Sequence, residues 1–134
     1  MKILAVDDNA TNLEILRVLL RSSGVPVLAA TDGDAAVETA RRERPDLIFM
    51  DLSMPGEIDG LEATRRIKAD PRTEHIVVIA ITAMVAAGDE AQALSAGCSA
   101  FIRKPYTRKQ LLSTVHRYFP HLAPACAPPG MPRC

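Results

Sequence analysis

Short runs of apolar residues recur along this chain, and a longer stretch with helical periodicity follows each of them. Three of the runs, ILAV, LIFM and IVVIAI, contain no alternating polar residue, which is typical of strands covered on both faces. Strands that alternate with helices form parallel sheets, because each connection must cross back to the starting edge. The expected fold class is therefore α/β. The predicted strands comprise residues 2–6, 27–31, 46–50, 76–81 and 100–102.

The stretches between these runs have apolar residues three and four positions apart, the spacing of one face of an α-helix. Leu13, Leu16 and Leu20 show it in the first stretch, and Leu111 and Val115 show it in the last. Five strand–helix units predict a five-stranded parallel sheet with right-handed crossovers and helices on both faces. The expected architecture is flavodoxin-like, with strand order 2-1-3-4-5.

The length of 134 residues is that of one domain with a single hydrophobic core. Apolar residues make up 48% of the chain and charged residues 24%, which excludes a chain that is disordered throughout. Residues 1–119 are predicted to form the domain. Residues 120–134 contain five of the ten prolines and little helical pattern, so they are interpreted as a flexible C-terminal tail.

Features of secretion and membrane insertion are missing from the sequence. Met1 and Lys2 precede only four apolar residues, which is too few for a secretory signal. The longest uncharged run near the middle, residues 76–88, has 13 residues, whereas a membrane-spanning helix needs roughly 18 or more. The three cysteines are an odd number and suggest no disulfide framework. A cytoplasmic location without a membrane span is therefore expected.

Charge is unevenly distributed along the chain. Basic and acidic residues balance at 16 each, but no aspartate or glutamate follows Glu90. Residues 91–134 consequently carry a net charge of +6, and residues 1–90 carry −6. The basic segment is interpreted as a solvated face, because its charges are sparse and have no aromatic residues between them. An acidic partner, a nucleic acid or a membrane surface remain alternatives.

Chemically active side chains stand where the predicted strands end. Asp7 and Asp8 follow the first strand, Asp51 the third, Thr82 the fourth, and Lys104 the fifth. The carboxyl ends of parallel strands meet at one edge of the sheet, where three carboxylates would repel one another unless a cation lay among them. Oxygen ligands favour Mg²⁺ over zinc. With a hydroxyl and an ammonium added, the set suits a phosphoryl group in transfer.

Simpler interpretations exist for the single residues. Asp8 or Asn9 could cap the first helix, because both residue types are preferred N-caps. Thr82 alone is an ordinary strand residue, and Lys104 alone an ordinary surface charge. Their joint occurrence at four strand ends favours the phosphoryl site.

Five short motifs of this sequence can be compared with known families. They are VDDN (6–9), DLSMP (51–55), DGLEA (59–63), ITA (81–83) and FIRKP (101–105). Together they resemble the receiver domain of two-component response regulators. The resemblance covers roughly residues 1–119 and is closest to receivers of hybrid histidine kinases and to single-domain regulators of bacterial cell division and polarity. One departure is the loop at residues 56–60, which is one residue longer than the commonest pattern.

This resemblance implies a phosphoacceptor and a metal site. Asp51 would accept a phosphoryl group from the phosphohistidine of a partner. Asp7, Asp8, Asp51 and the backbone carbonyl of Ser53 would hold Mg²⁺, for which Mn²⁺ can substitute. The domain would assist its own phosphorylation and dephosphorylation, and no turnover of a separate substrate is expected.

A phosphoryl-binding set and a switch are also implied by the family. Thr82, Ala83 and Lys104 would bind the phosphoryl oxygens. Thr82 and Phe101 would form the switch, in which the aromatic ring moves inward as the hydroxyl moves toward the phosphoryl group. Pro105 is a candidate for a cis peptide bond after Lys104.

The implied partners are proteins. A histidine kinase or a histidine phosphotransfer protein would dock at the first helix, where Asn12 and Arg17 lie beside the apolar face. A downstream protein would bind the face of the fourth helix, fifth strand and fifth helix, and a homodimer is a further expectation. No DNA-binding domain is expected, because only residues 120–134 follow the receiver.

Two other functions are weighed against this one. A small phosphohydrolase of the haloacid-dehalogenase type also combines an aspartyl nucleophile, a threonine or serine, a lysine and an acidic cluster. Here, however, Ser53 stands where that family has its second aspartate, and the chain has no room for a cap domain. The other alternative is a receiver that works by docking alone, independently of phosphorylation.

Overall fold

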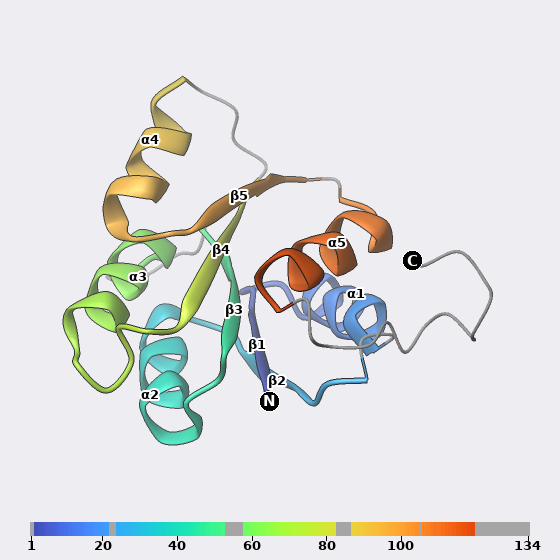
Figure 1. The fold of residues 1–134 in the computed structure, drawn as a ribbon, viewed down its shortest axis with the longest axis horizontal. Helices are drawn as coiled ribbons and strands as arrows, with labels where there is room; N and C mark the ends of the chain where they lie inside the picture. The colour runs from blue at the N-terminus through green and yellow to red at the C-terminus, as the bar shows by residue number, and fades with distance from the viewer. Residues whose placement is uncertain (1, 22–23, 53–57, 83–86, 105, 120–134) are drawn as a thin grey trace.

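A computed structural model describes residues 2–21, 24–52, 58–82, 87–104 and 106–119 (Figure 1). The tail predicted for residues 120–134 lies outside these ranges. Five strands alternate with five helices in this part of the chain. They are β1 (Ile3–Val6), α1 (Ala10–Leu20), β2 (Val27–Ala30), α2 (Gly33–Glu43), β3 (Leu47–Asp51), α3 (Gly60–Ala69), β4 (Val77–Thr82), α4 (Ala87–Ala96), β5 (Ala100–Arg103) and α5 (Arg108–Tyr118).

All five strands are parallel and form one sheet in the order β2-β1-β3-β4-β5. The prediction of a flavodoxin-like α/β fold is therefore confirmed. Each strand begins and ends within one residue of its predicted bounds. The two edge strands are β2 and β5, so the remaining three strands have neighbours on both sides.

Helices cover both faces of the sheet, with α1 and α5 on one side and α2, α3 and α4 on the other (Figure 1). Successive residues of a strand point to opposite faces, and both faces are buried. Ile48 and Met50 of β3 join the core cluster that includes residues of α2 and α3. Leu47 and Phe49 join the cluster that includes residues of α1 and α5. Two-sided burial explains why the strand sequences are apolar without alternation.

No helix among the described residues is long and apolar enough to cross a membrane.

A close approach between α3 and β3 fixes the position of Asp51. Gly60 is the first residue of α3, and a Cβ atom there would lie 2.2 Å from the carbonyl oxygen of Asp51 and 2.7 Å from the Cα of Leu52. Both contacts are with backbone, which cannot move without displacing the end of β3. The absence of a side chain at Gly60 thus lets α3 pack against the strand end.

We predict that Gly60→Ala destabilises the protein by roughly 1–3 kcal/mol, because overpacking against backbone forces the strand end to shift. Urea denaturation measures the change. By helix propensity alone the same substitution would be stabilising. The control is Ala91→Gly, at an exposed position of α4, which propensity alone should destabilise by about 0.5–1 kcal/mol. A more stable Gly60→Ala variant would contradict the close approach.

Candidate functional site

The strand order places the predicted site residues at one edge of the sheet. Val6 pairs in register with Met50, so Asp7 and Asp51 are the next residues of adjacent strands. Asp51 lies opposite Ile81 of β4, and Thr82 lies opposite Arg103 of β5. Residues that are far apart in sequence therefore meet at the carboxyl ends of β1, β3, β4 and β5, as predicted.

Three carboxylates converge at this edge. Asp7, Asp8 and Asp51 each offer an oxygen, and these oxygens all lie within 4.8 Å of one another. Asp7 and Asp51 are both only 3% exposed, whereas Asp8 is exposed to solvent. Like charges this close disfavour one another, and burial removes the water that would screen them.

Lys104 supplies the positive charge nearest to the buried carboxylates. Its Nζ lies 3.2 Å from Oδ2 of Asp7 and 3.4 Å from Oδ2 of Asp51. The backbone N–H of Lys104 donates to the carbonyl oxygen of Thr82 at 2.9 Å, which holds the segment after β5 against the end of β4. Lys104 thus contacts carboxylates at the ends of β1 and β3, and neither of these strands is next to β5 in the sheet.

The pKa of Lys104 reports the balance of forces on its ammonium. Burial lowers this pKa, but the carboxylates of Asp51 and Asp7 raise it by more through their charges and hydrogen bonds. The net effect is a pKa above the ordinary value for lysine. The ammonium is therefore charged throughout the neutral range and neutralises one of the three carboxylates.

The cap of α1 separates the roles of three consecutive residues. Asn9, and not Asp8, is the N-cap, and its side-chain oxygen accepts from the N–H groups of Thr11 and Asn12 at 2.9 and 3.1 Å. Oδ1 of Asp7 accepts from the N–H of Asn9 at 2.9 Å. Asn9 therefore satisfies the helix end, and Asp8 belongs to the acidic cluster.

The donor set fits a hard divalent cation. Three carboxylates and one ammonium leave an excess of two negative charges, and all the candidate ligand atoms are oxygens. Asp7, Asp8 and Asp51 are the residues able to hold such an ion. Ser53, whose carbonyl was the fourth predicted ligand, lies outside the described residues.

Of the residues predicted to bind the phosphoryl group, Thr82 and Lys104 stand at this edge. Thr82 is 1% exposed at the end of β4. Ala83 and Pro105 lie outside the described residues. Phe101, the predicted switch residue, is half-buried on β5 and packs against the core cluster on the α3 side of the sheet.

Tyr106 is a neighbour of the site that the sequence analysis did not single out. Burial raises the pKa of its half-buried phenol; Lys104 opposes this shift, and the charges of Asp7 and Asp51 add to it. The side chain of Tyr106 packs against the core cluster that includes residues of α1 and α5. The signal that would have found it is its position two residues after Lys104 and shortly before α5.

Relatives of known sequence resemble almost the whole chain. A polar-differentiation response regulator, DivK, from Brucella anthropi is 39% identical over 116 residues, which cover 87% of this chain and 94% of the relative. The DivK protein of Brucella ovis is 38% identical with the same coverage.

Solved structures agree with the sequence relatives. The receiver domain of a sensor histidine kinase from Pseudomonas aeruginosa, which has a magnesium ion coordinated in its active site cleft, superposes with a TM-score of 0.82 at 37% identity. The match covers 89% of this chain and 97% of that one. The receiver domain of a histidine kinase from Syntrophus aciditrophicus gives a TM-score of 0.81 at 34% identity, with 90% and 91% covered.

The sequence model of the response regulator receiver domain matches residues 3–116, which include the acidic cluster, Thr82 and Lys104. With this match, the sequence relatives and the common fold, the chain belongs to the family of response regulator receiver domains of two-component signalling.

Proposed function

We propose that Asp51 accepts a phosphoryl group from the phosphohistidine of a partner, in a reaction that depends on Mg²⁺. The observation that carries this proposal is the buried carboxylate of Asp51, which lies beside Asp7 and Asp8 and 3.4 Å from Nζ of Lys104. The magnesium ion in the related receiver from Pseudomonas aeruginosa supports the choice of metal. Mn²⁺, with similar ligand preferences, is expected to substitute.

The chemistry assigned to the chain is a displacement at phosphorus. A carboxylate oxygen of Asp51 forms the new O–P bond as the N–P bond of the phosphohistidine breaks, and the imidazole leaves. The ammonium of Lys104 pairs with a phosphoryl oxygen that carries developing charge, and the Thr82 hydroxyl donates to another. A bound Mg²⁺ would neutralise charge on the phosphoryl oxygens. Asp7 and Asp8 would hold that ion together with Asp51.

The same residues provide a route for the signal. A phosphoryl group on Asp51 adds negative charge next to the end of β4, which attracts the hydroxyl of Thr82. Phe101 lies on β5 opposite Ala80, two residues from the Thr82–Arg103 pair. Movement of Thr82 toward the phosphoryl group would vacate space that the half-buried ring of Phe101 can enter. This two-state element would connect Asp51 to the outer face of β5.

The partner that donates the phosphoryl group is proposed to dock on α1. This helix begins directly after the acidic cluster, and two large apolar side chains on it are unusually exposed, Ile15 at 48% and Val18 at 47%. A histidine kinase or histidine phosphotransfer protein could bury them while its histidine approaches Asp51. Downstream proteins, or a second copy of the chain, would bind the face formed by α4, β5 and α5.

Two rival functions make different predictions. A haloacid-dehalogenase-like phosphohydrolase would turn over a separate phosphate ester, whereas the proposed module only phosphorylates and dephosphorylates itself. A receiver that works by docking alone would hold Mg²⁺ without accepting a phosphoryl group. The complete set of acidic residues and Lys104 favours the phosphoacceptor over the docking module.

We predict that incubation with Mg²⁺ and acetyl phosphate adds one phosphoryl group to the wild-type protein, as measured by intact mass. Asp51→Asn should add none, because the nucleophilic oxygen is lost, and removal of Mg²⁺ with a chelator should also prevent the addition. No addition to the wild type, with Mg²⁺ bound, would indicate a docking module. Steady turnover of p-nitrophenyl phosphate would indicate a phosphohydrolase.

Charge substitutions in the cluster should change stability with opposite signs. In metal-free protein at neutral pH, we expect Lys104→Gln to lower the free energy of unfolding by roughly 1–2 kcal/mol, because two buried carboxylates lose their counter-charge. Asp8→Asn removes a repelling charge and should raise it. Urea denaturation with and without Mg²⁺ measures both, and Mg²⁺ should stabilise Lys104→Gln more than Asp8→Asn. A stabilised Lys104→Gln variant would refute the assumed balance of charges.

Docking on α1 predicts a difference between large and small phosphodonors. Ile15→Ser combined with Val18→Ser should slow phosphotransfer from a phosphorylated histidine phosphotransfer domain by about tenfold, through the loss of buried apolar area. Phosphorylation by acetyl phosphate should be unaffected, since no docking is needed. Leu94→Ser, which removes an equally exposed side chain from α4, is the control for lost surface hydrophobicity. Equal slowing with both donors would contradict the docking site.

A further inference from the structure

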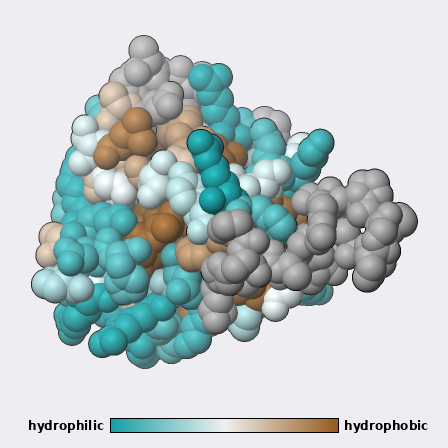
Figure 2. Space-filling view, in the orientation of Figure 1, coloured by the Kyte–Doolittle hydropathy of each residue, from teal (hydrophilic) through white to brown (hydrophobic). Residues whose placement is uncertain are grey.

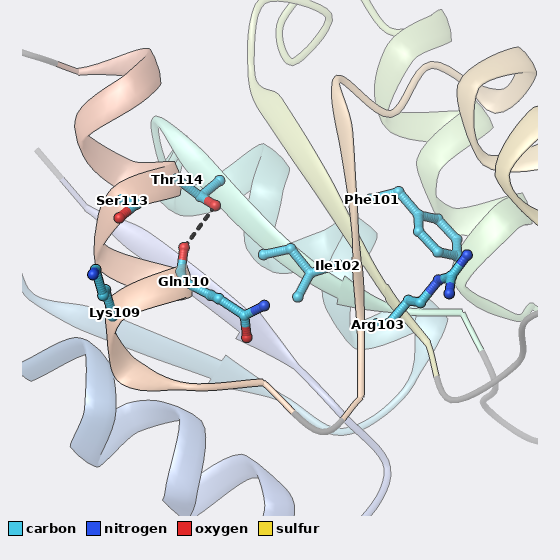
Figure 3. A pocket seen from close by; sticks show the side chains of 7 residues that line it. All are labelled: Phe101, Ile102, Arg103, Lys109, Gln110, Ser113 and Thr114. Atoms are coloured by element: carbon cyan, nitrogen blue, oxygen red, sulfur yellow. Dashed lines mark hydrogen bonds between the residues drawn. The ribbon is translucent and has the colours of Figure 1, made fainter.

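A groove of about 600 Å³ runs between β5 and α5 (Figure 3). Three consecutive residues of β5, Phe101, Ile102 and Arg103, line one side, and Lys109 and Ser113 of α5 are among those lining the other. Figure 3 shows Ile102 pointing toward α5, whereas Phe101 and Arg103 point to the opposite side of the strand. Consecutive strand residues cannot line one cavity with side chains on a single face. The groove therefore follows the open edge of β5.

This edge has backbone groups available for pairing. In the five-stranded sheet β5 pairs with β4 alone and is the last strand. The outer edge of such a strand presents N–H and C=O groups on which a further strand can form. At the opposite edge of the sheet, Pro26 precedes β2, and the adjacent cavity is only about 190 Å³. Of these two cavities, the one beside β5 is the larger.

The side chains around the groove include several cations. Among the described residues, no carboxylate forms an ion pair with Arg103 or Lys109, nor with Arg108 and Arg117 of α5. In contrast, Arg65 and Arg66 of α3 both pair with Glu62. The full sequence contains no acidic residue after Glu90, so the segment that builds the groove cannot neutralise itself.

Figure 2 shows one face of the molecule, on which hydrophilic residues surround smaller apolar areas. The groove beside β5 is bordered by Arg103, Lys109 and Gln110, so a ligand there gains specificity from charge and hydrogen bonds more than from apolar area. Edge-strand backbone and two unpaired cations supply both.

We propose that the open edge of β5 binds an acidic segment of a partner protein in extended conformation, which adds a sixth strand to the sheet. Its backbone would pair with β5, and its carboxylates would meet Arg103 and Lys109. A nucleic acid has no peptide groups to extend the ladder, so the geometry favours a protein. A second copy of the chain fits less well, because pairing two β5 edges would bring two sets of unpaired cations together. The inference rests on the proposed function in one respect: it identifies this partner as the protein that receives the signal from the phosphorylated domain.

The test uses a short fluorescein-labelled peptide in which pairs of adjacent glutamates alternate with valines, so that carboxylates lie on both faces of the added strand and can reach both Arg103 and Lys109. It is titrated with the full chain and followed by fluorescence anisotropy. Saturable binding is expected. The same peptide with glutamine for glutamate should bind about tenfold more weakly, the effect of losing two surface ion pairs. Arg103→Gln combined with Lys109→Gln should weaken the acidic peptide equally. Arg65→Gln combined with Arg66→Gln removes the same charge from α3 and should leave binding within about twofold of wild type.

Backbone methylation tests strand addition itself. A peptide N-methylated at every second residue keeps one edge able to pair and should bind, whereas a peptide N-methylated at every residue should not. A ligand that docks as a helix would lose binding in both cases, because each interior N–H is used within the helix.

Several results would overturn the proposal: no saturable binding, equal loss in both double variants, loss with the half-methylated peptide, or tighter binding of single-stranded DNA than of the peptide. Phosphorylation of each variant by acetyl phosphate is measured by mass in parallel. Peptide binding without phosphorylation would contradict the proposed function but support the binding site at the edge of β5. Phosphorylation without peptide binding would support the proposed function but contradict the binding site at the edge of β5.

Discussion

The repulsion among three carboxylates at one sheet edge is the constraint on which the site depends. Asp7, Asp8 and Asp51 lie within 4.8 Å of one another, and two of them are almost fully buried. Such a cluster costs free energy unless positive charge compensates it. Lys104 compensates part of it, and a divalent cation held by the same carboxylates would compensate the rest. Among the described residues, the buried carboxylates are both at this edge, and the other buried polar side chains are threonines.

The packing of the sheet offsets the free-energy cost of this repulsion. Residues of β1 and β3 that precede the acids are buried on both faces of the sheet, and they hold the strand ends in fixed register. The close approach of α3 to the carbonyl of Asp51 at Gly60 adds a second constraint on the same strand end. Apolar packing therefore supplies the free energy that keeps like charges together. Position along each strand decides which residue stands at the edge, and the parallel arrangement decides which residues meet.

Much of this could be predicted from the sequence, because the pattern that specifies the sheet also specifies its carboxyl edge. The apolar runs without alternation predicted the strands, and the residues after them predicted the convergence of Asp7, Asp51 and Lys104. The choice between Asp8 and Asn9 as helix cap could not be made, since both residue types cap equally well and only backbone geometry separates them. The groove along β5 could not be predicted from the sequence either. The predicted strand order already placed the fifth strand at an edge, but the groove itself depends on how α5 sits beside β5, which is a property of tertiary packing. Tyr106 was missed for the same reason, because its burial comes from contacts distant in sequence.

The strand β5 connects the acidic cluster to the groove. Its last residue, Arg103, lies in register with Thr82 and borders the groove, and the next residue, Lys104, contacts two carboxylates of the cluster. A phosphoryl group on Asp51 would give Lys104 a new partner and draw Thr82 toward it, so the end of β5 would be held differently in the two states. A ligand that binds the open edge of β5 would then favour one of those states. Linkage requires the effect to be reciprocal: a partner that prefers the phosphorylated form must also stabilise the phosphorylated form. The end of β5, where Arg103 borders the groove and Lys104 contacts the acidic cluster, would thereby couple charge at Asp51 to binding at the open edge.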